Sequence, residues 1–291
     1  MTGKSIANLC ALSLSLFVLW TAPGYAQTLS AAVSVSTPTQ QKLDPQMVLK
    51  QLRQSRVIYL GETHDSEADH RAQLEIIRSL HQQNPKLAIG MEMFQRPFQS
   101  GLDSYLAGAS TATRLREFTE YDKRWGYSWE FYYPIINFAK ENRLPVVALN
   151  TPAEVTRKVA RQGLESLTAE EKRYIPPIDE IRLEPERYRD RLQKIFAAHA
   201  GKGSSRWFNS FFQAQVLWDE TMADAIVQFL NKNPDRQIIV LAGQGHIIYG
   251  DGIPSRVARR IPQIKQSTIL LNPPAQYFGE AAIADFFWKT R

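Results

Sequence analysis

Cysteine is almost absent from this sequence. Cys10 is the only cysteine in 291 residues, and it lies in an apolar run close to the N-terminus. That run has the features of a cleaved leader, so the mature chain is expected to carry no disulfide, no thiolate metal site and no cysteine nucleophile. A cysteine at the cleavage point, which a lipoprotein anchor requires, is also missing.

Several catalytic and nucleotide-binding signatures are missing as well. The sequence has no Gly-x-Ser-x-Gly nucleophile elbow and no P-loop. Gly243 and Gly245 follow an apolar run, but the third glycine of a dinucleotide-binding fingerprint is absent. His64 and His70 do not form the helical His-Glu-x-x-His pattern of zinc proteases. These absences favour a site built from residues at several separate strand ends.

The N-terminus has the three parts of a secretory signal peptide. Lys4 precedes the apolar run 9–20, and small residues then lead to a cleavage point before Gln27. Residues 1–26 are therefore predicted to be removed, and the mature chain is expected to have no transmembrane segment. Residues 27–43 are rich in Ser, Thr, Ala and Gln, which is typical of a flexible tether. Secretion across the inner membrane, to the periplasm or the cell surface, is the expected localisation.

Charge gives little reason to expect a nucleic-acid partner. The net charge is +6, but the positive residues alternate with carboxylates, as in the segment 184–191. Such alternation is typical of a solvated helix face. A basic rim could still hold an anionic ligand.

Apolar runs alternate with helical patterns along the chain, which predicts an α/β fold. A mostly parallel sheet with helices on both faces is expected, in a single domain over residues 44–291. A helical insertion is predicted around 164–203, where charged and proline-containing stretches interrupt the pattern. The predicted strands are 56–60, 87–91, 145–149, 238–242 and 267–271.

Two of these strands end in the same pattern, Gly-x-x-His. One ending gives Glu62 and His64, the other gives His246, and the strand between them in the sequence leads into Glu92. Ligands of parallel sheets bind outside the carboxyl ends of the strands, so these side chains are expected to share one site. Two histidines and a carboxylate can hold a divalent metal with open coordination positions. The alternative is that both histidines only cap or hydrogen-bond ordinary loops.

Two further features allow more than one interpretation. The aromatic block 121–133 is typical of packing material, although a tyrosine phenolate can also ligate haem iron. Asp219 and Glu220 lie on the predicted helix 207–230, where a solvated carboxylate pair is the simpler interpretation.

The chain resembles the ChaN-like haem-binding uptake proteins, in a superfamily that includes the Tiki/TraB metalloprotease-like proteins. The resemblance runs from about residue 57 to residue 272. It depends on the ordered set of motifs Gly61-Glu62-Thr63-His64, Gly90-Met91-Glu92-Met93-Phe94, Trp125-Gly126-Tyr127-Ser128-Trp129, Val147-Ala148-Leu149-Asn150-Thr151-Pro152, Gln213-Ala214-Gln215-Val216-Leu217-Trp218-Asp219 and Gly243-Gln244-Gly245-His246.

The ChaN resemblance implies an exported haem-binding protein that takes part in haem and iron uptake. It also implies a homodimer around haem, with tyrosine ligation assisted by a histidine. His64, His246 and Tyr249 are the candidate cofactor-binding residues. Tyr249 is chosen for its position just after His246, and Tyr105 and Tyr121 are the alternative tyrosines.

The Tiki resemblance implies a different activity, a metal-dependent hydrolase. His64, Glu92 and His246 would then hold a divalent ion such as Mn, Co or Zn, and Glu62 would be the base that activates a bound water. A third interpretation is a scaffold that keeps only the fold. Whether the chain is an enzyme is therefore open, with haem binding as the leading hypothesis.

Overall fold

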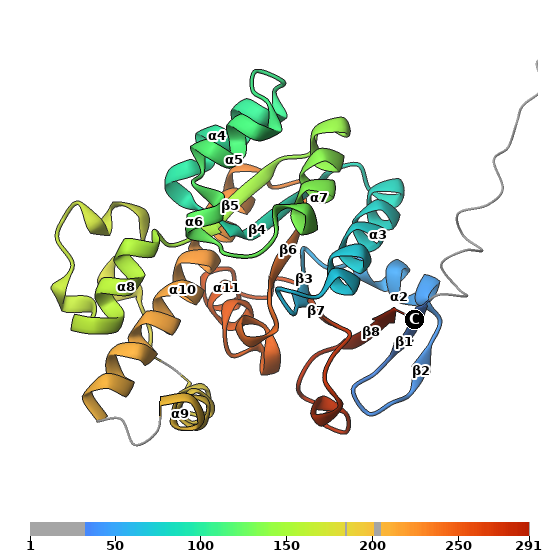
Figure 1. Cartoon of the computed structure of the whole chain (residues 1–291). Helices are drawn as coiled ribbons and strands as arrows, with labels where there is room; N and C mark the ends of the chain where they lie inside the picture. The colour runs from blue at the N-terminus through green and yellow to red at the C-terminus, as the bar shows by residue number, and fades with distance from the viewer. Residues whose placement is uncertain (1–32, 184, 201–204, 291) are drawn as a thin grey trace, which may run out of the picture.

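The computed structural model describes residues 33–183, 185–200 and 205–290 (Figure 1). The predicted signal peptide 1–26 lies outside these residues. Within the described ranges, no helix combines the length and the apolar character that crossing a membrane requires.

One eight-stranded sheet organises the chain, and its strand order is β2-β1-β8-β7-β3-β6-β4-β5. The six strands from β8 to β5 run parallel, whereas β1 is antiparallel to both of its neighbours. The predicted mostly parallel sheet is confirmed. The strands are β1 (Val33–Ser36), β2 (Lys42–Leu43), β3 (Val57–Glu62), β4 (Leu87–Gln95), β5 (Val146–Asn150), β6 (Gln237–Gly243), β7 (Gln266–Leu271) and β8 (Phe286–Thr290).

Helices cover both faces of this sheet (Figure 1). One face packs against α2 (Pro45–Leu52), α3 (Glu67–Gln83), α4 (Gln99–Leu106), α5 (Ala112–Phe118), α6 (Tyr121–Arg124) and α7 (Trp129–Glu141). The opposite face packs against α10 (Ser205–Lys232) and α11 (Ile253–Arg260). The expected helices on both faces are confirmed.

The two cores follow from the alternation of side chains along each strand. Ile58 and Leu60 of β3 enter the core that contains α3 and α7, whereas Val57 and Tyr59 enter the core that contains α10. Successive side chains of a strand point to opposite faces, so a strand covered on both sides reads as a continuous apolar run. This explains why β3 carried no polar alternation in the sequence.

The beginning of the folded domain differs from the prediction. The segment 27–43 was expected to be a flexible tether, but β1 and β2 lie in it and extend the sheet beyond β8. Val33 and Val35 are buried, whereas Ser34 and Ser36 are less so. Two alternating valines are too short a pattern to predict a strand in a Ser- and Thr-rich sequence. The neighbouring strand β8, with which β1 pairs, was not predicted either.

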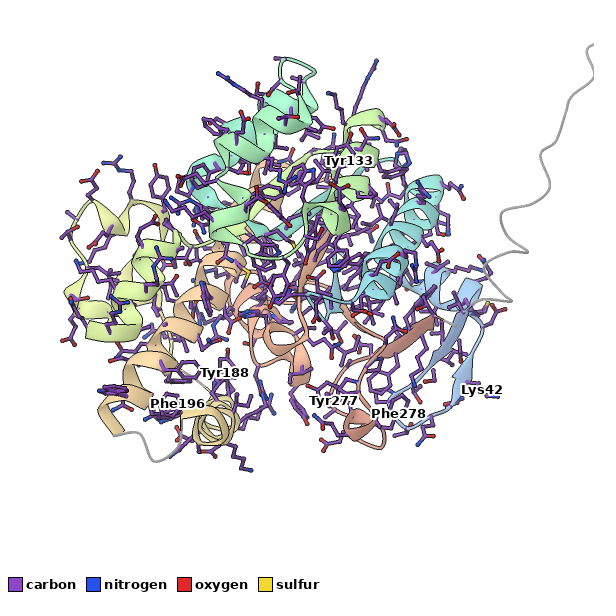
Figure 2. The ribbon with its side chains drawn as sticks, viewed as in Figure 1. Lys42, Tyr133, Tyr188, Phe196, Tyr277 and Phe278 are labelled. Atoms are coloured by element: carbon purple, nitrogen blue, oxygen red, sulfur yellow. The ribbon has the colours of Figure 1, made fainter. Side chains whose placement is uncertain are left out.

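The described residues of the predicted insertion, 164–183 and 185–200, contain short 3-10 helices and one α-helix. They are η2 (Leu164–Ser166), η3 (Glu171–Tyr174), η4 (Ile178–Glu180) and α9 (Glu186–Ala200). Together with α8 (Ala153–Gln162) and the first half of α10, they form a third hydrophobic cluster. Figure 2 labels Tyr188 and Phe196 of α9. The ring of Tyr188 contacts Phe212 of α10, and the ring of Phe196 contacts Phe208 of the same helix.

Candidate functional site

The first Gly-x-x-His turn is held in place by the start of α3. Ser66 caps this helix by accepting a hydrogen bond from the backbone N–H of Asp69. The Asp69 carboxylate accepts from the backbone N–H of Thr63 at 2.8 Å and from the Asn272 amide at 2.7 Å. The turn that carries His64 is thereby tied to both α3 and the residue that follows β7.

Glu62, the last residue of β3, is buried and fully hydrogen-bonded. Its Oε1 accepts from His64 Nδ1 at 2.8 Å and from the Tyr132 hydroxyl at 2.5 Å, and its Oε2 accepts from the Gln73 amide at 2.5 Å. Burial alone would raise the pKa of Glu62, but the hydrogen bonds and charges of His64 and His70 outweigh it and lower the pKa to about 2. Glu62 is therefore a permanent anion that orients His64.

His246 forms a matching pair with a second buried carboxylate, Asp219 of α10. His246 Nδ1 lies 2.7 Å from Asp219 Oδ1, and the Tyr188 hydroxyl donates to the other oxygen at 2.5 Å. Burial works against a charged imidazole, but Glu92 and Asp219 outweigh it and raise the pKa of His246 to about 10.

Glu92 lies between the two histidines. Its Oε2 accepts from the backbone N–H of Gly243 at 2.8 Å, and its Oε1 lies 3.4 Å from His246 Nε2. A Cβ atom on Gly243 would come within 2.8 Å of His64 Nε2 and 3.8 Å of Glu92 Oε2. The glycine therefore lets His64 approach the strand end beside Glu92, and the structure brings the three predicted residues together.

A register shift in the sheet helps to place Glu92. The residue lies within β4, which continues to Gln95, and the pairing of β4 with β5 shifts between Met91 and Gln95. Such irregularities change the direction of side chains and are common beside active sites. The Asn150 amide then donates to the backbone carbonyl of Glu92 at 2.9 Å and fixes the strand end.

Buried carboxylates orient both histidines of the site. Each histidine has its Nδ1 on a buried carboxylate, which fixes the ring orientation, as it does in both catalytic and metal-binding histidines. Across the described ranges, however, no three His, Cys, Asp or Glu side chains converge as a metal site. Aromatic rings flank the pair, with Trp125 and Tyr127 against His64 and Trp218 against His246.

Tyr249 lines a cavity that does not include His64 or His246 among its lining residues. Its hydroxyl donates to Glu280 at 2.7 Å, and its ring lies under the guanidinium of Arg191 at 4.9 Å. Burial, followed by the charge of Glu280, raises the pKa of Tyr249 to about 12. The cavity has a volume of about 380 Å³ and is lined by Arg187, Asp190, Arg191, Lys194, Tyr249, Asp251 and Ala282.

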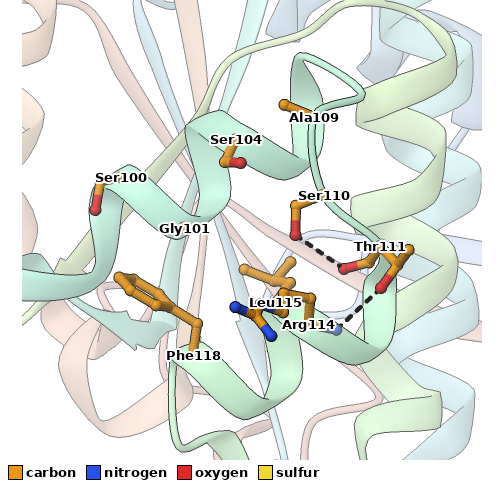
Figure 3. A pocket seen from close by; sticks show the side chains of 9 residues that line it. All are labelled: Ser100, Gly101, Ser104, Ala109, Ser110, Thr111, Arg114, Leu115 and Phe118. Carbon is orange, nitrogen blue, oxygen red and sulfur yellow. Dashed lines mark hydrogen bonds between the residues drawn. The ribbon is translucent and has the colours of Figure 1, made fainter.

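Another cavity lies between α4 and α5 and contains none of the predicted site residues. Its volume is about 420 Å³. Hydroxyl groups, one arginine and the ring of Phe118 surround it (Figure 3).

Sequence reasoning misplaced one of the functional residues. Asp219 and Glu220 were expected on a solvated helix face, but both side chains are 0% exposed. Asp219 is enclosed by Tyr188 and His246, and Glu220 is paired with Arg259 and Arg260. The arginine-rich sequence of α11 is the signal that could have indicated a buried carboxylate partner.

The raised pKa of His246 predicts that stability depends on pH in the alkaline range. Between its ordinary value of 6.5 and about 10, the folded state keeps a proton that the unfolded state releases. The free energy of unfolding should therefore fall as pH rises through this window, by up to about 1.4 kcal/mol per pH unit. Urea denaturation between pH 6.5 and pH 10 measures this slope.

The control for this prediction is another histidine. His246→Gln should flatten the slope, whereas His81→Gln, which removes a histidine packed on Phe138, should keep it. An equal slope in wild type and His246→Gln would show that His246 is not the group that titrates.

Comparisons with known proteins agree with this architecture. A family model described as haem-binding uptake, Tiki superfamily, ChaN matches residues 48–257. A structure of cofacial heme binding to ChaN of Campylobacter jejuni has a TM-score of 0.72 at 18% identity, covering 89% of this chain and 97% of that one. A succinoglycan biosynthesis protein has a TM-score of 0.52 at 12% identity, covering 92% and 96% of the two chains. At these identities, both structures show the fold alone.

A curated plant protein also matches. The chain is 28% identical over 264 residues to Protein RETICULATA-RELATED 5, chloroplastic, of Arabidopsis thaliana, which covers 84% of this chain but only 35% of that protein. The chain thus spans about a third of that relative's length. The family model, by contrast, extends over most of this chain, from α2 to α11, and confirms the resemblance seen in the motifs. This chain belongs to the haem-binding uptake family of the Tiki superfamily, the ChaN family.

Proposed function

We propose that this chain is an exported protein that binds haem for iron uptake, with Tyr249 as the iron ligand. The observation that carries the proposal is the family match over residues 48–257. The cavity of Tyr249 adds to it, because it combines a phenol with several cationic side chains at the carboxyl edge of the sheet.

The residues of this cavity fit a haem. A tyrosine oxygen is an established iron ligand, and the only side-chain partner of the Tyr249 hydroxyl in the described contacts is Glu280, an exposed residue. Nη2 of Arg191 is buried and has no hydrogen-bond partner among the described residues. Buried cationic donors are costly to leave unpaired, so this nitrogen favours an anionic ligand nearby.

The histidines are connected to this cavity but do not line it. Arg191 lies over Tyr188 at 5.1 Å as well as over Tyr249, and Tyr188 donates to Asp219, which holds His246. We therefore propose that His246 assists ligand binding through this chain of contacts. His64 lies on the other side of Glu92 from His246, so we propose that His64 affects ligand binding by way of Glu92 and His246.

The direct test is spectroscopic. Ferric haem is added to the mature chain, residues 27–291, and the Soret band is followed during titration. A saturable shift at one haem per chain supports the proposal, and an unshifted band contradicts it. Size-exclusion chromatography with and without haem tests the homodimer that the ChaN resemblance implies, and N-terminal sequencing of the exported protein tests cleavage before Gln27.

Removing the charge of Glu280 should strengthen haem binding. The Glu280 carboxylate raises the pKa of Tyr249 by hydrogen bonding and by its charge, so Glu280→Gln should ease formation of the phenolate. Each pKa unit recovered is worth about tenfold in phenolate population, and we expect a gain of about 3- to 10-fold in haem affinity at pH 7. Glu165→Gln, an exposed carboxylate far along the chain, is the charge control. Weaker haem binding by Glu280→Gln would contradict the assigned role of Tyr249.

The second candidate is a hydrolase that uses His64, Glu92 and His246. It is favoured by one observation, namely that both histidines are oriented by buried carboxylates and approach Glu92. In this reaction Glu62 would orient His64, because its two oxygens already accept three hydrogen bonds. Elemental analysis for Mn, Co or Zn separates the two candidates. A stoichiometric metal that is lost in His64→Ala would favour the hydrolase.

A further inference from the structure

The cavity between α4 and α5 is lined mainly by hydroxyl groups and contains one charged side chain. Its volume of about 420 Å³ lies within the range of small-molecule sites. Helix α4 contributes Ser100 and Ser104, the loop between the helices contributes Ser110 and Thr111, and α5 contributes Arg114 (Figure 3). None of its lining residues lines the cavity that is proposed to hold haem.

The guanidinium of Arg114 has no carboxylate partner. It makes no ion pair and no hydrogen bond within the described ranges, and Arg114 is the only charged residue among those that line the cavity. Arg116, two residues further along the same helix, is instead paired with Asp122 at 2.8 Å. Arginine binds carboxylates and phosphates through paired N–H bonds. The cavity therefore favours a ligand with one anionic group.

The hydroxyls favour a ligand larger than a simple anion. Those of Ser100 and Ser104 make no hydrogen bond within the part of the chain that is described. These two serines lie one helical turn apart, with about 6 Å between their Cβ atoms, which is wider than the spacing of the oxygens in one phosphate. A serine hydroxyl both donates and accepts, as a sugar hydroxyl does. A ligand that carries several hydroxyls on a ring can reach both serines and Arg114.

Phe118 adds an apolar surface to the same cavity. Phe118 is 50% exposed, yet its ring is held in place by two neighbours. A Cβ atom on Gly101 would overlap Cδ1 of Phe118 and come within 2.9 Å of Cε1, and Phe98 meets the ring edge-on at a centroid distance of 6.0 Å. Phe118 follows Arg114 by four residues, so both lie on one side of α5. An apolar ring beside hydrogen-bonding groups suits the C–H face of a sugar.

We propose that the cavity between α4 and α5 is a binding site for an acidic sugar, a pyranose ring that carries a carboxylate. Arg114 binds the carboxylate, Ser100 and Ser104 bind ring hydroxyls, and Phe118 packs on the C–H face. This site is separate from the haem site and does not depend on the proposed function.

The experiment adds three probes to the mature chain, residues 27–291, without haem. Glucuronate and glucose differ by the carboxylate, and their dissociation constants come from saturation-transfer NMR. Inorganic phosphate is tested as a competitor of glucuronate. The proteins are the wild type, Arg114→Gln, Ser104→Ala and Phe118→Leu, and the melting temperature of each is measured. Arg116→Gln, which removes a charge from the same helix outside the cavity, is the matched control.

We expect the wild type to bind glucuronate with a Kd in the millimolar range and glucose about tenfold more weakly. Arg114→Gln should weaken glucuronate binding by about tenfold and leave glucose binding unchanged, because only one of the sugars has the carboxylate. Ser104→Ala and Phe118→Leu remove contacts with the ring itself, so each should weaken both sugars by about threefold. Arg116→Gln should bind like the wild type.

Four results would overturn the proposal. The first is a wild type without saturable glucuronate binding up to about 50 mM. The second is displacement of glucuronate by an equal concentration of phosphate, which shows a site for any anion. The third is an equal loss of glucuronate binding in Arg114→Gln and Arg116→Gln, which shows an effect of net charge. The fourth is unchanged sugar binding in Ser104→Ala, which decides the ring contacts even if Phe118→Leu melts below the wild type.

Discussion

Tyr249→Phe should weaken the binding of ferric haem by about 100-fold and shift the Soret band of any complex that remains. Phenylalanine keeps the ring on which Arg191 packs and removes only the hydroxyl, which is the proposed iron ligand. The loss therefore isolates ligation from packing. Titration of the purified variant with ferric haem, followed at the Soret band, measures both the affinity and the spectrum.

A neighbouring tyrosine provides the control for this substitution. Tyr277 lies close enough to Tyr249 and Arg191 for their charges to affect one another, so Tyr277→Phe tests whether any nearby phenol serves as the ligand. Its haem affinity should equal that of the wild type. Wild-type affinity in Tyr249→Phe, or a loss in Tyr277→Phe alone, would contradict the assignment.

The pH dependence of binding adds a second measurement to the same variant. Tyr249 has a pKa of about 12, so below that pH its phenol must release a proton when the oxygen binds iron. The haem affinity of the wild type should rise with pH, by about tenfold per pH unit where this proton is released to solvent. Tyr249→Phe should lose that slope, whatever residual binding remains.

The sequence predicted five of the six parallel strands, β3 to β7, but it missed β8 and could not predict the strand order. Two Gly-x-x-His endings suggested a shared site, and the structure brings these endings together because β3 and β6 are neighbours with Glu62 opposite Gly243. Neighbouring strands are set by long-range pairing that no local pattern encodes. Glu92 joins them because β4 is the next neighbour of β6.

Residues that orient the site histidines without following a strand were the hardest to identify from the sequence. Asp219 lies on a long helix more than twenty residues before His246, and its partner Tyr188 comes from α9. A carboxylate on a helix is solvated by default, and only the arginines of α11 and the packing of α9 make burial of this one favourable. Tyr249 was chosen for its sequence position beside His246, and the structure places it in a cavity that His246 does not line, beyond the turn that separates the two residues.

Gly252→Ala should be the most destabilising small substitution at this edge of the sheet. A Cβ atom at Gly252 would overlap the backbone carbonyl oxygen of His246 and come within 2.8 Å of its carbonyl carbon and 3.1 Å of Asp219 Oδ1. Two of these atoms belong to the backbone, so no side-chain rotation relieves the overlap. We expect a loss of about 3 kcal/mol in the free energy of unfolding, which lowers the melting temperature by roughly 6–12 °C.

Gly245→Ala is the matched control for this substitution. Gly245 lies in the same Gly-x-x-His turn, one residue before His246, yet a Cβ atom there meets nothing within 4 Å. It should melt within about 2 °C of the wild type. Because the clash pushes on His246 beside Asp219, Gly252→Ala should also lower the pKa of His246 and flatten the alkaline slope of stability. If Gly252→Ala melts like Gly245→Ala and keeps this slope, the backbone at Gly252 can move to accommodate the added Cβ atom. Close packing at Gly252 would then not be what holds His246 against Asp219.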